Sequence, residues 1–534
     1  MILIFLQLIL YKKCCRNTII HIVKQKTKHK KYNNREDFKM KKKIVSSLLA
    51  VSMLAATLAG CGGSDGASNS TSDAPASNTS DTSAGNTADA PADNTADAPA
   101  DALAETDNAA PEGQVINIYS FNDELRTRIT AVYPEIESTS ADGTSSTLKD
   151  GTEIRWIINP NQDGVYQDKL DEALGNQLTA PDNDKVDIFA AEMDYVVKYT
   201  DADIDAAMTL ESLGINPDTD LADQFDFTKT VASDQNGVMR ASTWQACPGV
   251  LVYRRDIAKE VFGTDDPVEI GKKTKDWDAM KATAEELKAK GYYALSSYAD
   301  TFRTYSNSMS EAWVAPGETV VKVDQKLMDW VVDSKEWKNA GYFDPAVKGQ
   351  WNADWFTAMS SSSKVFAFLF PAWGIDTQLK PNWDGADGSW AVTNAPLSYN
   401  WGGTFVLAAE GTDNPSHVKD ILLALTADTD NLTEISKKYA DFTNAKSVME
   451  AAATDSSFAS DFLGGQNPYT YFTPGADTIQ MAPLSAYDQG CVELFQNAFG
   501  DYLQDQIDFD KAKANFETAI MERYPEITAV QWPE

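Results

Sequence analysis

The sequence predicts an α/β protein built from two lobes, with a helical C-terminal region. Short apolar runs that are typical of strands alternate with stretches of helical period along the middle of the chain. About 420 residues carry this pattern, more than one compact lobe usually holds. The region from about Pro415 to Tyr524 is nearly all helical, with an apolar stripe at Val418, Ile421, Leu422 and Leu425.

The elements follow one another in an order that favours strand–helix–strand units. After the first strand candidate, the next dozen residues predict a helix, and a second helix is expected over Tyr166–Leu178. This alternation predicts a mostly parallel sheet. The strand candidates are Val115–Tyr119, Glu153–Ile158, Val186–Phe189, Gly249–Tyr253, Lys364–Phe370 and Thr404–Ala409.

A lipoprotein signal peptide is predicted over residues 40–60. Three lysines after Met40 precede a short apolar stretch, and Leu58-Ala59-Gly60-Cys61 has the small residues expected before a lipidated cysteine. Cleavage before Cys61 would anchor the protein to the outer face of the bacterial cytoplasmic membrane. We expect residues 1–39 to be an over-extended reading frame, with an additional membrane anchor as the alternative.

The segment that follows, residues 61–113, is predicted to be a lipid-anchored, disordered acidic linker. It consists mostly of Ala, Asp, Ser, Thr, Asn, Pro and Gly, and the eight residues from Thr87 recur almost unchanged from Thr95. Such a composition cannot bury a core. We therefore expect it to hold the folded part away from the membrane surface.

Charge and composition exclude several functions. The net charge is −33, and residues 1–60 carry 13 Lys and Arg against 2 Asp and Glu, so the remainder is at −44. This acidity argues against nucleic acid as a partner and limits membrane contact to the lipid anchor. His417 is the single histidine after residue 60, which removes most metal-ligand sets and His-based triads. We predict no metal, no cofactor and no enzymatic activity.

Five segments of the chain carry a resemblance to a known family: Ile118–Glu124, Val186–Tyr195, Ala246–Ile257, Val365–Gly374 and Trp401–Val406. Their order, together with the signal peptide and linker, resembles the extracellular solute-binding proteins of carbohydrate ABC transporters, which include maltose-binding protein. The likeness covers the chain from about residue 114 to residue 534.

The resemblance implies a periplasmic-binding-protein-like fold with a ligand cleft between two lobes. Matching positions assign residues 114–246 and 401–460 to the N-terminal lobe, and residues 247–400 and 461–534 to the C-terminal lobe. Hinges are then expected near Ala246–Pro248 and Asn400–Gly403. Pro248, Gly402 and Gly403 suit a backbone that turns or flexes.

A sugar site needs flat rings for stacking and planar polar groups for paired hydrogen bonds. By the resemblance, Trp373 matches a tryptophan that stacks on sugar, and Trp244 and Trp401 sit at the predicted lobe crossings. Polar candidates follow the predicted strands, where open α/β sheets bind ligands. By the resemblance, Asp194 matches an acidic sugar-binding position, and other candidates fall in a ligand-contacting loop or at a ligand-facing helix start. The polar candidates and the tyrosines beside them are Asn122, Asp123, Glu192, Asp194, Tyr195, Asp300, Arg303, Tyr487 and Asp488.

These features predict a monomer that binds a sugar or oligosaccharide outside the cytoplasmic membrane and delivers it to ABC permease subunits. Two alternatives stay open: a surface sensor of the same fold, and a non-sugar solute such as a peptide or polyamine, which an acidic cleft would suit. A glycoside hydrolase is disfavoured because nothing marks a pair of carboxylates across one bond. The sequence also lacks the common nucleophile, zinc and phosphate-loop motifs.

Overall fold

The computed structural model describes residues 112–533, which form one compact unit. The signal peptide, Cys61 and the linker up to residue 111 lie outside the described residues. Within the described part, no helix is both long and apolar enough to span a bilayer.

The first sheet is mixed and gathers strands from both ends of the folded part. β1 lies at its centre and pairs in parallel with β4 and with β5, whereas β12 returns antiparallel to β5. β1 is buried almost throughout because both faces of the sheet are covered. In spatial order the strands are β2 (Ile136–Thr139), β3 (Ser145–Leu148), β4 (Glu153–Ile158), β1 (Val115–Ser120), β5 (Ile188–Glu192), β12 (Thr404–Ala408) and β6 (Ser242–Thr243).

A second sheet contains the most apolar strands of the chain. Every residue of β7 and β10 is buried, and these two central strands run antiparallel to each other. A third, two-stranded sheet joins β9 (Val320–Lys322) to β13 (Ala529–Gln531) near the C-terminus. The order of the second sheet is β11 (Trp390–Thr393), β7 (Gly249–Arg254), β10 (Val365–Pro371) and β8 (Tyr293–Leu295).

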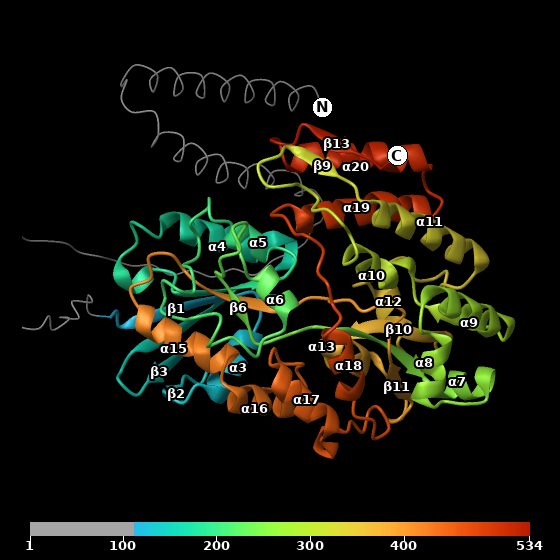
Figure 1. Cartoon of the computed structure of the whole chain (residues 1–534), viewed down its shortest axis with the longest axis horizontal. Coiled ribbons are helices and arrows are strands. Elements are labelled where there is room, and N and C mark those ends of the chain that lie inside the picture. The colour runs from blue at the N-terminus through green and yellow to red at the C-terminus, as the bar shows by residue number, and fades with distance from the viewer. Residues whose placement is uncertain (1–111, 534) are drawn as a thin grey trace, which may run out of the picture. The chain divides into compact units, whose positions relative to one another are not determined.

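Helices cover both faces of the first sheet. Figure 1 shows α4 and α5 on one side of β1, and α15 with α3 on the other. α15 begins with Pro415 at its first turn and buries the predicted stripe at Val418, Ile421, Leu422 and Leu425. The helices of this part are α3 (Glu124–Val132), α4 (Val165–Asn176), α5 (Val196–Thr200), α6 (Asp226–Val231), α15 (Pro415–Thr426), α16 (Thr429–Tyr439) and α17 (Lys446–Thr454).

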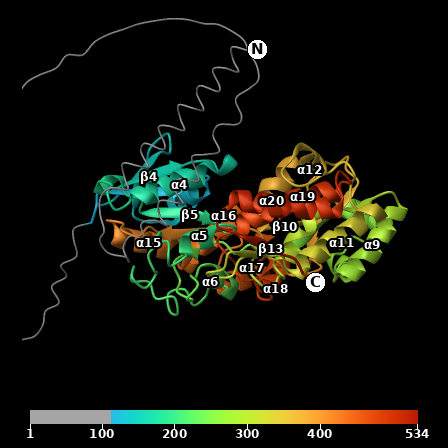
Figure 2. The ribbon, with the colours of Figure 1, turned by 90° about the horizontal axis from the view of Figure 1, so that it is seen from above.

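Further helices surround the second sheet. α19 and α20 lie side by side in Figures 1 and 2, and α11 packs on α19. α7, α8 and α9 adjoin β7, β11 and β8. The helices are α7 (Arg255–Phe262), α8 (Pro267–Lys273), α9 (Trp277–Ala289), α10 (Phe302–Ser306), α11 (Gln325–Ala340), α12 (Ala353–Thr357), α13 (Ala372–Gly374), α14 (Lys380–Asn382), α18 (Tyr469–Ala476), α19 (Asp488–Leu503) and α20 (Phe509–Arg523).

The α/β class is confirmed, but the prediction of a mostly parallel sheet is wrong. β2 and β3 form an antiparallel hairpin, β12 enters antiparallel beside β5, and β10 and β11 both run antiparallel to β7. Strand direction depends on where the chain re-enters a sheet. The local apolar pattern does not carry that information.

The two segments expected to act as hinges lie against each other. Trp401 N–H donates to the carbonyl of Cys247 over 3.0 Å, and the Asn400 side-chain oxygen accepts from Cys247 N–H over 3.1 Å. Gly402 and Gly403 have φ of +83° and +119°, which only glycine adopts readily. The lobe boundaries and hinge roles stay predictions.

Candidate ligand-binding site

The carboxyl end of β5 supplies two acidic side chains. Asp194 N–H donates to the Glu192 carboxylate over 2.7 Å, which turns the chain sharply after the strand. Burial, together with the negative charge of Asp194 and against the opposing charge of Arg303, raises the pKa of Glu192 to about 8. Glu192 therefore takes up a proton more readily than an ordinary glutamate, and the protonated form can donate a hydrogen bond.

Asp194 and Arg303 form a bidentate ion pair between segments that follow different sheets. Arg303 lies on α10, after β8 of the second sheet, and its two terminal nitrogens donate to the two Asp194 oxygens over 2.6 and 2.5 Å. The side chains are 17% and 24% exposed. Such fork-to-fork pairs fix geometry as well as charge.

Asp488, the first residue of α19, faces the same ion pair. It lines a narrow cavity of about 30 Å³ with Asp194 and Arg303. Burial raises the pKa of Asp488 to about 7, although Ser485 donates to its carboxylate through both backbone and side chain. We call Glu192, Asp194, Arg303 and Asp488 the charged wall.

Three tryptophans form a second surface, which we call the aromatic wall: Trp351, Trp373 and Trp401. Trp373 follows β10, and its indole N–H donates to the Trp401 carbonyl over 3.0 Å. Trp351 lies nearly parallel to Trp373, with ring centroids 6.2 Å apart and 13° between the planes. Trp351 is 55% exposed and Trp373 is partly exposed, so this wall offers ring surface to solvent.

The two walls meet at Gly402. A Cβ atom at this position would lie 3.3 Å from the Trp373 indole nitrogen and 3.4 Å from a Glu192 oxygen. The positive φ favours glycine, and the close approach leaves little room for a Cβ atom. The nitrogen-bearing edge of the Trp373 indole and the partly buried Glu192 carboxyl group therefore lie close to one point of the backbone.

A further, partly buried carboxyl group belongs to Glu124, which begins α3 after β1. Gln245 donates to it over 2.7 Å, and Arg128 over 3.4 Å. Burial raises the pKa of Glu124 to about 7, and the charge of Asp441 adds to the rise. Burial also raises the pKa of the Cys247 thiol, with smaller contributions from Glu124, Asp441 and Glu192. Glu124 and Glu192 thus both lie close enough to Cys247 for their charges to raise the pKa of its thiol.

The remaining predicted residues belong to neither the charged wall nor the aromatic wall. Asn122 and Asp123 are exposed and make local bonds, to Glu124 N–H and to Arg126. Tyr195 is buried beside Tyr199. Tyr487 donates to Glu526 over 3.2 Å and packs edge-on against Tyr524.

Two predicted contacts need correction. Trp244 is fully buried and donates its indole N–H to Asp441, so no ring face is left for a ligand. Asp300 is 4% exposed, and its oxygens accept hydrogen bonds from Ser296, Ser297, Gln350 and Trp355. Asp300 therefore positions neighbouring segments instead of facing a ligand.

Sequence reasoning missed Trp351 and Glu124. Trp351 stands in Gly349-Gln350-Trp351-Asn352, where a tryptophan among turn-forming residues is a usable signal for an exposed ring. Glu124 directly follows Asn122 and Asp123, the two polar candidates after the first strand. Its burial depends on Gln245, which is distant in the sequence.

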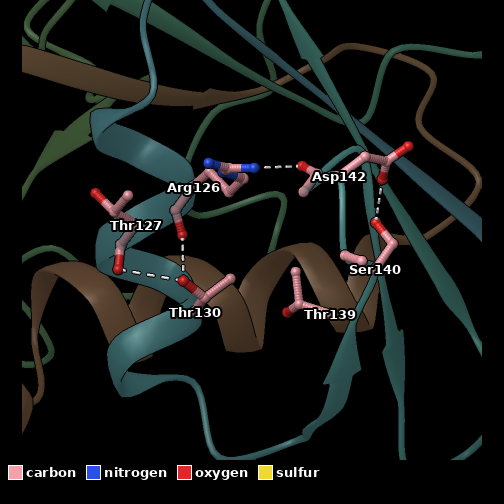
Figure 3. A pocket seen from close by; sticks show the side chains of 8 residues that line it. Arg126, Thr127, Thr130, Thr139, Ser140 and Asp142 are labelled. Atoms are coloured by element: carbon pink, nitrogen blue, oxygen red, sulfur yellow. Dashed lines mark hydrogen bonds between the residues drawn. The ribbon is translucent and has the colours of Figure 1, made fainter.

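A wider hollow lies elsewhere, between α3 and the β2–β3 turn. Figure 3 shows it lined by Arg126, Thr127, Thr130, Thr139, Ser140 and Asp142. Its volume is about 340 Å³, and none of its lining side chains is aromatic. It contains none of the predicted site residues.

Comparison with known proteins defines the class. Residues 149–461 match the family model described as bacterial extracellular solute-binding protein. The match spans more than half of the chain, so the chain belongs to this family. It is the solute-binding protein of an ABC transporter, acts outside the cytoplasm and is not an enzyme.

Solved structures share the fold at low sequence identity. A crystal structure of an extracellular solute-binding protein of family 1 is 17% identical, with a TM-score of 0.61, and the match covers 78% of this chain and 100% of that one.

Two further structures contain sugars. The ABC-transporter-associated binding protein of B. animalis subsp. lactis Bl-04, in complex with beta-1,6-galactobiose, is 15% identical (TM-score 0.55, 78% and 100% covered). The extracellular solute-binding protein of Staphylococcus aureus, in complex with maltose, is 14% identical (TM-score 0.51, 78% and 99% covered). No curated protein matches the chain.

Proposed function

We propose that this protein binds a sugar or short oligosaccharide between its aromatic and charged walls and delivers it to the transporter permease. The observation that carries the proposal is the convergence of Trp373 and Glu192 at Gly402. A sugar has apolar C–H faces and a rim of hydroxyl groups. It therefore needs a ring face and buried polar partners at adjacent positions.

The charged wall supports a neutral ligand. Arg303 already neutralises Asp194 through both of its terminal nitrogens. Glu192 and Asp488 have pKa values raised to about 8 and about 7, so part of the carboxyl population is neutral near pH 7. Neutral carboxyl groups both donate and accept hydrogen bonds, which suits sugar hydroxyls. The sugars bound to proteins of the same fold support the same ligand class.

The experiment is a thermal-shift screen of mono- and oligosaccharides, with peptides and polyamines as competing solutes, followed by calorimetric titration. A ligand bound only by the folded state raises the melting temperature. Trp373→Ala should weaken the binding of the best sugar by about tenfold to hundredfold, the equivalent of roughly 1–3 kcal/mol of stacking.

Trp383→Ala is the matched control. Trp383 is also partly exposed and also donates its indole N–H to a backbone carbonyl over 3.0 Å, but it packs on Arg254 and Trp390. Its loss should leave sugar affinity unchanged. A polyamine or peptide that binds where every sugar fails would replace the proposal, as would normal sugar affinity in folded Trp373→Ala.

We place the site of action at the outer face of the membrane, through a lipid on Cys61. Two features of the sequence support this placement: basic, apolar and small residues follow one another before Cys61, and the linker after it has a composition that cannot form a hydrophobic core. Cys61→Ser should release the protein from the membrane fraction. Retention of the variant there at an unchanged apparent mass would refute the anchor.

A further inference from the structure

Trp351 has a backbone conformation that a bulky side chain rarely adopts. Its φ is +63°, in the left-handed region, and its ring is 55% exposed, so little burial offsets the strain. Neighbouring bonds hold the turn. Gln350 donates to Asp300 over 3.0 Å, and the Asn352 side chain accepts from Trp355 N–H over 3.0 Å to cap α12.

This turn places the indole of Trp351 beside the other two rings of the aromatic wall. The ring stacks on Trp373 at 13° and meets the edge of Trp401 at 78°, with centroids 6.2 and 6.1 Å away. Trp351 therefore covers a face of Trp373, the residue to which the proposed function assigns sugar stacking. A strained residue that is held by its neighbours and aimed at a binding surface calls for a functional reason.

We propose that Trp351 is a specificity-determining residue, which forms with Trp373 a two-sided clamp for a pyranose ring whose hydroxyls are equatorial. The proposal rests on the proposed function. Carbon atoms pack at about 3.5–4.0 Å, so a sugar ring between two parallel indoles needs about 7–8 Å between their planes. The centroids are 6.2 Å apart, so the rings must separate by at least about 1 Å to admit a sugar.

The clamp makes a chemical distinction that one ring cannot make. Against a single indole, a galactose-type ring can turn its unhindered face to the stack and leave its axial 4-hydroxyl in water. Between two indoles, that hydroxyl must face an apolar surface and lose hydrogen bonds. A glucose-type ring presents axial C–H groups on both faces. The ligand class is therefore an oligosaccharide with a terminal glucose-type ring.

The test uses two pairs of disaccharides that differ only at the terminal C4: cellobiose against lactose, and isomaltose against melibiose. The wild-type protein should bind the glucose-type member of at least one pair at least tenfold more tightly. Trp351→Gly should weaken that binding about tenfold and reduce the discrimination to less than about threefold. Its melting temperature should not fall, because glycine relieves the strained φ.

Two further variants keep the result interpretable. Trp351→Asn introduces a residue that tolerates a positive φ, and it should show the same loss of discrimination. Asp205→Gly changes another exposed non-glycine residue with positive φ, 53°, and should leave affinity and discrimination unchanged.

Three outcomes overturn the clamp: equal wild-type binding within both pairs, no wild-type binding to any of the four sugars, and unchanged discrimination in Trp351→Gly. If other sugars bind and depend on Trp373, the clamp alone fails. If no sugar binds at all, the proposed function fails with it.

Discussion

The wider hollow of Figure 3 and the junction of the two walls differ in nearly every property that bears on binding. The hollow beside α3 has about 340 Å³ of space, and its lining side chains are small except for Asp142 and Arg126. The cavity beside Asp194 and Arg303 has about 30 Å³ and is lined by both of these side chains and by Asp488, whose pKa burial raises to about 7. Free volume alone therefore does not identify the candidate site. Side chains that a ligand could stack on or hydrogen-bond to are the better guide.

The largest effect is expected from Arg303→Met. Removing the guanidinium leaves Asp194 without its partner beside Glu192 and Asp488. Breaking a buried pair costs about 3–5 kcal/mol, and the 17% and 24% exposure of this pair places the expected loss of unfolding free energy at about 2–4 kcal/mol. Denaturant melts of the ligand-free protein measure it.

Lys149→Met provides the control for this experiment. Lys149 and Glu135 are 57% and 51% exposed, so removing this pair should cost less than about 1 kcal/mol. Equal losses in the two variants would show that the charged wall does not hold the fold together.

A smaller effect is expected from the titration of Glu192. Its pKa is about 8 in the folded state, against an ordinary value of 4.5, mainly because of burial. Between these values the folded state binds more protons than the unfolded state, so the contribution of Glu192 to stability is fully present below about pH 4.5 and is lost as pH rises through about 8. Asp488, with a pKa of about 7, acts in the same direction. The melting temperature should therefore fall from pH 5.5 to pH 8.5.

Glu192→Gln should make this fall shallower because an amide does not titrate. Glu137→Gln, a change at an exposed position of β2, should keep the wild-type pH profile. If Glu192→Gln and wild type lose stability in parallel, Glu192 is not the group that titrates.

The smallest effect is expected in the wide hollow. Thr139→Ala removes a hydroxyl that lines it and bonds to Ser146 over 2.9 Å. Neither wall includes a residue of this hollow, so sugar affinity should stay within about twofold of wild type by calorimetric titration. A tenfold loss would move the binding site to the hollow.

The amino-acid pattern alone predicts the α/β class, the helical C-terminal region and six of the thirteen described strands. The apolar run of β10 and the apolar stripe of α15 are predictable because both are local patterns: a fully buried strand is apolar throughout, and a helix buried on one face is apolar at every third or fourth residue. The same information placed Trp373 at the end of a buried strand and Asp194 after another. Both residues lie in the candidate site.

Which of these side chains stay exposed, and which have their hydrogen bonds satisfied, depends instead on the tertiary structure. Trp244 and Trp373 look alike in sequence, yet one is enclosed against Asp441 and the other keeps part of its ring exposed. Asp300 and Asp194 are both acidic residues beyond a strand, but the first is saturated by hydrogen bonds from its own loop and from the Gln350 turn. Exposure and hydrogen-bond saturation depend on partners that are distant in the chain, and a local sequence pattern carries no record of them.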